Sequence, residues 1–339
     1  MRNIYLYIIC ISIVSCATLQ QAGWQQPQGF PPPVYDFTQN PLTPEKILAG
    51  RILFYDPILS ADSSISCASC HSSYNAFAHT DHKLSHGIHN RNGMRNAPGL
   101  FNLAWQTSFM WDGAIEHLDM QALAPINSAT EMGSTTADVV NKLQQSALYK
   151  SLFKNAFGDT IITGQHVLQA LSAFELTLVS NHAKYDAVKA GKTVFTQQEA
   201  KGYALFLQYC NACHTEPLFT NYSFANNGLS PDTILHDQGR VRITDLTTDV
   251  NLFKVPSLRN LSYTFPYMHD GRYAQLSQVL QHYAGLKENQ PDCTPPLNQG
   301  LVLSSNDRVD LIAFLLTLDD QSFAQQTDYQ YPRNILTTH

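Results

Sequence analysis

The sequence has little charge, few cysteines and no apolar run long enough to cross a membrane. Charged residues make up 14% of the 339 residues, against the usual share of about a quarter. Acidic residues outnumber basic ones by 27 to 21, and the net charge of −6 has no basic stripe, which argues against nucleic acid as the main partner. Seven cysteines are too few for a disulfide scaffold in a chain this long. With 44% apolar residues, the chain is instead globular, and its length suggests two domains.

The first sixteen residues are typical of an export signal. Arg2 precedes an apolar run from Ile4 to Val14, which is shorter than the roughly 20 residues of a membrane-spanning helix. The run ends in Ile-Val-Ser followed by Cys16, a pattern that resembles a bacterial lipobox and predicts lipidation of Cys16. An ordinary cleaved signal and an uncleaved anchor are the alternatives. Residues 17–42 are rich in Gln and Pro and predict an extended tether. We therefore expect a periplasmic or cell-envelope protein, with a lipid anchor as its only contact with the membrane.

Two halves of the chain carry the same pattern. Gly-x-x-Leu-Phe occurs at residues 50–54 and again at 202–206, each time ahead of a Cys-x-x-Cys-His motif. Strand patterns are sparse. We expect two mostly helical domains, at residues 43–190 and 191–339.

Four helices can be placed from local signals. Thr43 and Pro44 predict a helix start, and Thr196 with Glu199 forms a capping box. Residues 167–178 predict a helix that closes the first half. Near the C-terminus, another helix is predicted by apolar residues at helical spacing, namely Val309, Ile312, Leu315 and Leu316.

The Cys-x-x-Cys-His motif is typical of covalent attachment of a c-type haem. Two thiols form thioethers with the haem vinyl groups, and the adjacent histidine ligates the iron. The attachment residues are therefore Cys67 and Cys70 with His71, and Cys210 and Cys213 with His214. A zinc site, a redox dithiol or a disulfide explains two complete copies less well. Cys293 is left over in a Pro-rich stretch expected to be a surface loop, and it has no assigned role.

Several residues between the two motifs could serve peroxide chemistry. Such chemistry needs an open iron face and an acid/base group that moves a proton between the peroxide oxygens. Glu131 is one candidate for that group. On the sequence alone, a solvated glutamate is the simpler interpretation of Glu131, and a buried aromatic residue is the simpler interpretation of Trp111.

Ordered motifs make the chain similar to the bacterial diheme cytochrome c peroxidase family, which includes MauG-type enzymes. In the first half the matching segments are residues 54–56, 65–71, 95–98, 111–113 and 131–132. In the second half they are residues 210–214, 256–260 and 266–271. The likeness extends over nearly the whole chain after residue 40. It implies a mainly α fold of two cytochrome c-like helical domains, each with one covalently attached haem.

The resemblance also implies roles for individual residues. His71 would be the proximal ligand of the peroxide-reacting haem, with Glu131 as distal acid/base and Gln121 lining the same pocket. His214 would be the proximal ligand of an electron-entry haem, and Trp111 would lie between the two haems.

A structural calcium ion usually lies between the domains of such proteins. The resemblance places its protein ligands on Asn96 and on the backbone carbonyls of Thr264 and Pro266. Oxygen-only ligation suits a hard cation such as Ca²⁺.

The sequence departs from the peroxidase branch at two positions. Many members cap the peroxide haem with a loop histidine, and Ile88 stands at that place, although His86 and His89 lie close by. A Met ligand usually lies 14 residues after the position of His269, where this chain has Tyr283. MauG-type enzymes carry a ligating Tyr there, so we expect Tyr283 to be the sixth ligand of the second haem. A core Tyr, with another residue as ligand, is the alternative.

These observations predict an enzyme that reduces hydrogen peroxide to water with electrons from a small cytochrome c or cupredoxin. A MauG-like oxidase that uses peroxide to oxidise side chains of a partner protein is the alternative, and a plain electron carrier is the third hypothesis. The resemblance also implies that homodimers are common.

Overall fold

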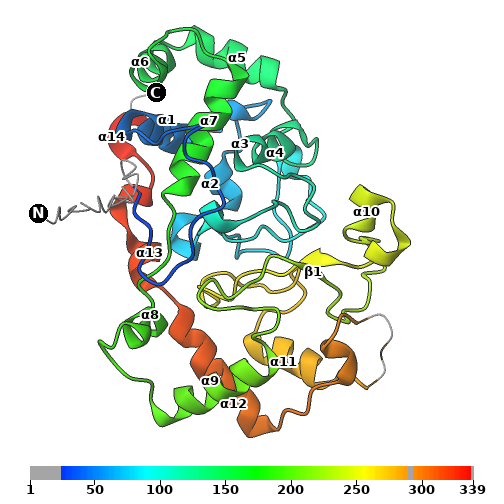
Figure 1. Ribbon diagram of the computed structural model, residues 1–339. Coiled ribbons are helices and arrows are strands. Elements are labelled where there is room, and N and C mark those ends of the chain that lie inside the picture. The colour runs from blue at the N-terminus through cyan, green and yellow to red at the C-terminus, as the bar shows by residue number, and fades with distance from the viewer. Residues whose placement is uncertain (1–23, 289, 291–292, 337–339) are drawn as a thin grey trace, which may run out of the picture.

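The computed structural model describes residues 24–288, 290 and 293–336. The predicted signal peptide and Cys16 lie outside the described residues. Two helical halves lie one above the other in Figure 1, and the chain passes from the upper to the lower half just before α8. No helix in the described part is long and apolar enough to span a membrane.

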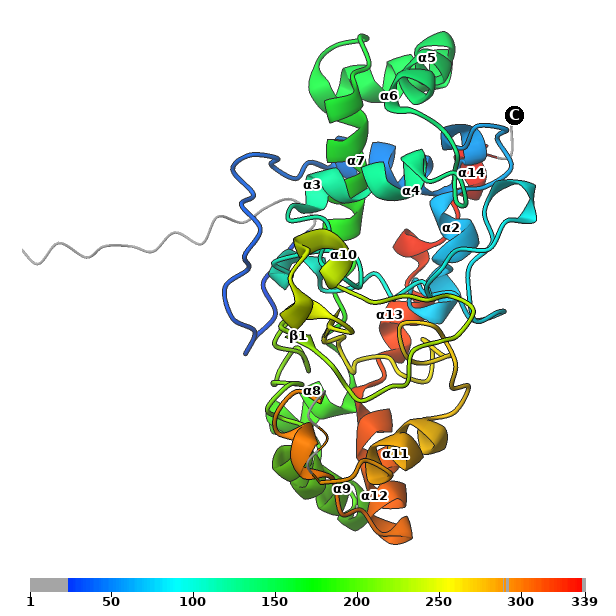
Figure 2. The ribbon, with the colours of Figure 1, turned by 90° about the vertical axis from the view of Figure 1, so that its right-hand side faces the viewer.

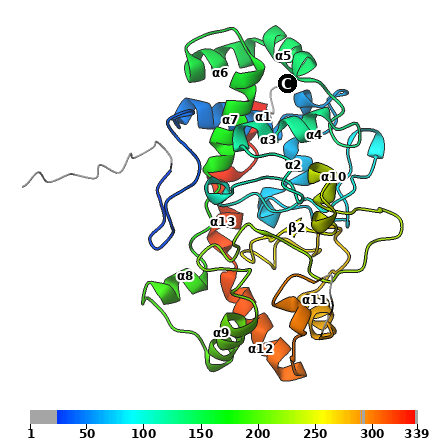
Figure 3. The ribbon, with the colours of Figure 1, turned by 45° about the vertical axis from the view of Figure 1, so that its right-hand side comes forward.

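The helices of the first half are α1 (Pro44–Tyr55), α2 (Cys67–Cys70), α3 (Leu118–Gln121), α4 (Leu123–Asn127), α5 (Thr136–Gln145), α6 (Ala147–Phe157) and α7 (Gly164–Leu176). The remaining helices are α8 (Lys184–Lys189), α9 (Gln197–Tyr209), α10 (Val241–Thr244), α11 (Leu276–Ala284), α12 (Ser305–Leu315), α13 (Gln321–Gln325) and α14 (Arg333–Leu336). Short 3-10 turns lie at Pro57–Leu59, Ser73–Asn75, Ile88–Asn90, Leu103–Trp105, Thr247–Asp249, Leu297–Gln299, Leu316–Leu318 and Thr327–Tyr329. Strands β1 (Phe224–Ala225) and β2 (Phe253–Lys254) pair antiparallel near the junction of the halves (Figure 3).

The helix starts that the sequence predicts are confirmed. The Thr43 side chain accepts a hydrogen bond from the backbone N–H of Lys46 at the start of α1. Thr196 and Glu199 form the expected capping box at the start of α9. The helix predicted at residues 167–178 is α7, which begins three residues earlier and ends two residues earlier.

The repeated glycine marks the closest helix crossing in each half. A Cβ atom at Gly50 of α1 would lie 1.8 Å from the backbone oxygen of Ala170 in α7. A Cβ atom at Gly202 of α9 would lie 1.9 Å from the backbone oxygen of Asp310 in α12. Only a residue without a side chain lets these backbones touch. The repeated motif therefore specifies the same helix pair twice.

The helix predicted near the C-terminus is confirmed as α12, which ends at Leu315. On α12, Leu311, Phe314 and Leu315 are buried, whereas Val309 and Leu316 are 55% and 44% exposed. Phe314 packs against Phe206 of α9 at a ring-centroid distance of 5.1 Å, so this side of α12 faces α9.

The predicted tether is wrong for the part that the structure describes. Trp24, Phe30 and Leu42 are buried in a cluster with Trp105, whose indole N–H donates to the backbone oxygen of Pro31 at 2.7 Å. Residues 24–42 therefore pack on the first half.

The C-terminal segment returns to the first half, as Figure 2 shows for α13 and α14. Phe323 is buried in the first core, and Tyr329 packs against it. The Arg51 side chain donates to the backbone oxygen of Gln330 at 2.6 Å. This segment thus belongs to the first core rather than to the predicted second domain, while the boundary near residue 190 stays a prediction.

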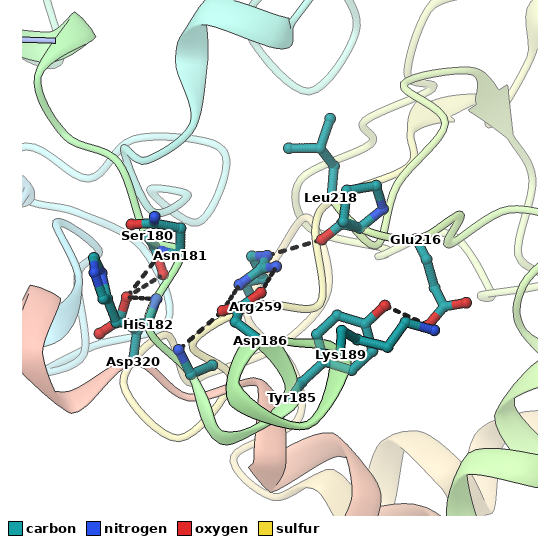
Figure 4. Close-up of polar contacts among 12 residues, drawn as sticks. Ser180, Asn181, His182, Tyr185, Asp186, Lys189, Glu216, Leu218, Arg259 and Asp320 are labelled. Carbon is teal, nitrogen blue, oxygen red and sulfur yellow. Dashed lines mark hydrogen bonds and ion pairs between the residues drawn. The ribbon is translucent and has the colours of Figure 1, made fainter. Parts of the chain in front are cut away.

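A buried carboxylate fixes the crossing between the halves. Asp320 is fully buried and accepts hydrogen bonds from Ser180 and from the backbone N–H groups of Asn181 and His182 (Figure 4). Nearby, the fully buried Arg259 makes a bidentate ion pair with Asp186, with nitrogen–oxygen distances of 2.7 and 2.8 Å. The Asp320 bonds hold residues 180–182 against the segment that returns to the first half, and the Arg259 ion pair fixes α8 on the second half.

Candidate functional site

One continuous cavity of about 670 Å³ lies between the two halves and is lined by both Cys-x-x-Cys-His motifs. Cys67, Cys70 and His71 approach it from the first half, and Cys210, Cys213 and His214 from the second. The two attachment sites that the sequence predicts therefore share one enclosed space. The walls combine apolar side chains with a few polar groups, which is typical of a cofactor site.

His71 is oriented as an iron ligand. Its Nδ1 atom lies 2.7 Å from the backbone oxygen of Phe77. Because a carbonyl oxygen only accepts hydrogen bonds, Nδ1 carries the proton and Nε2 is left for coordination. Burial lowers the pKa of His71 to about 4, so the ring is neutral, as metal binding requires.

His214 repeats this arrangement in the second half. Its Nδ1 atom lies 3.1 Å from the backbone oxygens of both Phe219 and Pro256, and burial lowers its pKa to about 4. Phe77 and Phe219 both have positive φ angles, 59° and 55°, which turn their carbonyls toward the histidines. Burial also raises the pKa of the Cys210 thiol to about 12. All of these features fit two covalently attached haems.

Glu131 and Gln121 line the same cavity on the side of the first attachment site. Burial raises the pKa of the Glu131 carboxyl, and a hydrogen bond from Ser128 opposes this effect. The amide nitrogen of Gln121 lies 3.8 Å from the sulfur of Met110. A carboxyl with a raised pKa in an enclosed cavity is suited to exchanging protons near neutral pH.

Within the described part of the chain, neither His86 nor His89 lines the cavity. His86 pairs with Asn90, with Nδ1 2.8 Å from the amide oxygen, and His89 is largely exposed beside Asp62. Ile88 is buried, and its backbone N–H donates to the backbone oxygen of Glu131 at 2.8 Å. The loop is therefore tied to the backbone of Glu131 without offering a histidine ligand.

Trp111 lies at the junction of the halves. Its indole N–H donates to the backbone oxygen of Asn96 at 2.8 Å, and its ring stands edge-on to His269 at a centroid distance of 6.5 Å. His269 stacks on Phe253 at 3.7 Å. Trp111 also lines the shared cavity, so an aromatic contact connects the first half to the second.

Tyr283 and its neighbour His282 point in different directions from α11. Tyr283 lines the shared cavity, and burial raises its pKa to about 12. His282 instead lines a separate groove with residues of α12, and its Nε2 atom lies 3.0 Å from the backbone oxygen of Asn227. Of the two, only Tyr283 is placed to meet a cofactor in the cavity.

The three calcium ligands that the family resemblance implies remain a prediction. Asn96, Thr264 and Pro266 all line the cavity. The amide nitrogen of Asn96 donates to the backbone oxygen of Lys83 at 3.1 Å, so this bond does not occupy the amide oxygen. No cluster of three His, Cys, Asp or Glu side chains suited to a metal ion occurs among the described residues, but an amide and carbonyl site needs none.

Glu175 and Lys254 are among the charged cavity residues that sequence reasoning missed. Glu175 on α7 is 4% exposed, and burial raises its pKa to about 8. Lys254 on β2 lies beside Trp111, and burial lowers its pKa to about 7. A charged side chain inside an apolar helix or a strand is the signal that could have found them. Cys293, expected in a surface loop, is buried.

Each helical half carries one attachment motif, and both motifs face the same cavity. Their histidines are neutral and are hydrogen-bonded to backbone carbonyls. These features define the protein as a diheme c-type cytochrome. The family model for di-haem cytochrome c peroxidases matches residues 44–194. The methylamine utilization protein MauG of Methylorubrum extorquens is 38% identical over 88% of this chain and 84% of its own. The cytochrome c551 peroxidase of Nitrosomonas europaea is 32% identical over 84% and 81%. The chain belongs to the di-haem cytochrome c peroxidase family, and the predicted resemblance is confirmed.

Solved structures agree on the fold. A MauG-like protein associated with microbial copper homeostasis is similar with a TM-score of 0.81 and 30% identity, covering 91% of this chain and 99% of its own. The diheme peroxidase BthA of Burkholderia thailandensis is similar with a TM-score of 0.74 and 22% identity, over 87% and 92%. The predicted fold class, mainly helical with two cytochrome c-like domains, is confirmed.

Proposed function

We propose that the protein reduces hydrogen peroxide to two waters, consuming two protons and two electrons for each peroxide. The observation that carries this proposal is the buried Glu131, with its raised pKa, in a cavity shared by both haem attachment sites. Several relatives are named cytochrome c peroxidases, which supports the same reaction class.

Three residues of the first half have separate roles in this proposal. His71 would hold the haem iron through Nε2, since the carbonyl of Phe77 fixes its ring. Glu131 takes a proton from one peroxide oxygen and delivers it to the other, while Gln121 offers an amide to orient the substrate. When bound, the haems supply iron that binds peroxide and that accepts and donates electrons.

Electrons enter at the second half, from a small cytochrome c or cupredoxin that docks near His214. Trp111 is the side chain best placed to carry electrons across the junction, because it lines the cavity and contacts His269. Both haem sites then work together in one turnover.

A second function is favoured by Tyr283. A phenolate is a hard anionic ligand that stabilises oxidised iron, and Tyr283 rather than His282 faces the cavity. With Ile88 in place of a loop histidine, the first haem site needs no prior reduction to open. Both features suit a MauG-like oxidase, in which peroxide oxidises side chains of a partner protein. Relatives named MauG support this alternative.

Rapid mixing of the diferric protein with peroxide, with and without reduced cytochrome c, separates these functions. Prompt oxidation of the cytochrome without prior reduction of the protein is the result expected for the peroxidase. A long-lived spectrum of oxidised haem with little cytochrome turnover would support the oxidase. Absence of any peroxide reaction, even after reduction of one haem, would show a plain electron carrier and refute both.

Calcium, export and assembly complete the proposal. Calcium would bind the Asn96 amide oxygen and the carbonyls of Thr264 and Pro266, next to Trp111. Removing calcium with a chelator should slow electron transfer between the halves.

The chain would work in the periplasm, anchored by a lipid on Cys16. The intact mass of the mature protein tests this lipid anchor. Sedimentation would show whether two copies form the homodimer that the family resemblance implies.

A further inference from the structure

Lys254 is joined to Trp111 through the backbone, and its side chain reaches the segment that precedes Trp111. Its backbone N–H donates to the backbone oxygen of Trp111 at 2.7 Å. Its side chain runs back to the segment before Trp111, where Nζ donates to the backbone oxygen of Ser108 at 2.6 Å and to the side-chain oxygen of Gln106 at 2.7 Å. Lys254 and Gln106 both line the shared cavity.

The ammonium has no anionic partner in the described part of the chain. Ser108 and Gln106 offer neutral oxygens, and no carboxylate lies within 4 Å of Nζ in residues 24–288, 290 and 293–336. Burial lowers the pKa of Lys254, and the charge of Asp112 opposes this effect, but the Asp112 carboxylate is itself bound by Arg95 at 2.6 Å. A buried cation without a counter-ion is costly, because water no longer solvates its charge. This site is therefore incomplete without an anion in the cavity.

Two donors remain for such an anion. An ammonium carries three N–H bonds, and the two protein acceptors leave the third for the cavity. Since an ammonium only donates, the Gln106 atom that contacts it is the amide oxygen, and the amide nitrogen keeps its own N–H donors. Lysine and glutamine thus offer N–H groups to an acceptor of negative charge.

We propose that Lys254 and Gln106 bind a haem propionate. A propionate is the anion that a haem in this cavity would bring with it, and its carboxylate suits paired N–H donors. Since Lys254 also holds the backbone of Trp111, the contact would fix the bridging residue relative to the haem edge. This inference rests on the proposed function, which requires both haems, and adds a residue that positions one of them.

The variant Lys254→Met in the holoprotein tests the proposal, with Lys254→Arg to keep the charge and Lys201→Met on the exposed face of α9 as the matched control. Intact mass first establishes that both haems are attached. The reduction potentials of both haems are then measured by spectroelectrochemistry, and their propionate bending bands by resonance Raman. Removing a positive charge near the iron stabilises the oxidised form, so we expect Lys254→Met to lower the potential of one haem and shift its propionate band. Lys254→Arg should retain most of the wild-type values, and Lys201→Met should change neither.

Unchanged potentials and bands in Lys254→Met with both haems attached would overturn the proposal. If that variant does not mature, a crystal structure of the wild-type holoprotein decides. A propionate oxygen within hydrogen-bond distance of Nζ would support the proposal, and an Nζ that contacts only Gln106, Ser108 and water would refute it. Peroxide turnover of the wild-type protein is measured separately. If Lys254 does not contact a propionate, the proposed peroxidase reaction is therefore not refuted.

Discussion

The indole N–H of Trp111 donates to the backbone oxygen of Asn96, 2.8 Å away. This bond holds the ring at the junction of the halves, beside His269. We predict that Trp111→Phe slows oxidation of the second haem by peroxide at least tenfold, which corresponds to about 1.4 kcal/mol in the barrier. Rapid mixing of peroxide with protein reduced only at the second haem measures this rate.

Trp105→Phe is the matched control for the bridging role. Trp105 also donates its indole N–H to a backbone oxygen, that of Pro31, but it lies in the packing cluster of the first half. The control should leave the rate between the haems unchanged. A Trp111→Phe protein as fast as the wild type would show that electrons take another path.

The cavity carboxylate Glu131 should set the acidic limb of the pH profile. Burial raises its pKa, and the ionised form is the one that accepts a proton from peroxide. The kcat/KM for peroxide should therefore fall on acidification at a higher pH than an ordinary glutamate would allow. Glu131→Gln should lower kcat/KM by about 10²–10⁴ and abolish this limb. The exposed Glu116→Gln serves as control, and a fully active Glu131→Gln protein would exclude the proposed role.

The haem attachment sites and the helix starts could be predicted from the sequence because they depend on local motifs. The Cys-x-x-Cys-His pairs, the N-cap at Thr43 and the capping box at Thr196 depend on neighbouring residues, and such signals can be read along the chain. The repeated glycines at positions 50 and 202 also pointed to a duplicated unit, although their closeness to Ala170 and Asp310 became visible only in three dimensions.

The features that the sequence analysis missed depend on contacts between distant residues. Lys254 meets Gln106 across 148 positions, and Arg51 meets Gln330 across 279, so neither pattern is local. Burial of Trp24 and Phe30 depends on their contacts with Trp105, far along the chain, which override the extended preference of Gln and Pro.

The buried Glu175 should make stability decrease as pH rises. Its pKa is about 8 in the folded protein and about 4.5 when unfolded, so between these values the folded state binds a proton that the unfolded state lacks. Stability then falls by up to about 1.4 kcal/mol per pH unit as pH rises to 8. Glu175→Gln removes this loss, so its advantage over the wild type should grow from pH 5 to pH 8. Guanidinium unfolding at several pH values tests this, with exposed Glu45→Gln as control, and a pH-independent difference would contradict it.

The helix crossing at Gly202 should tolerate no side chain. A Cβ atom there would meet the backbone oxygen of Asp310 at 1.9 Å and the Cβ of Phe314 at 2.8 Å, so α9 and α12 would have to separate. Overpacking of this kind costs about 1–3 kcal/mol, although alanine is the better helix former by about 1 kcal/mol. We expect Gly202→Ala to lower the free energy of unfolding in guanidinium. The neighbouring Lys201→Ala, exposed on the same helix, should stay within about 0.5 kcal/mol of the wild type. Equal stability of Gly202→Ala and Lys201→Ala would show that the crossing can widen without cost.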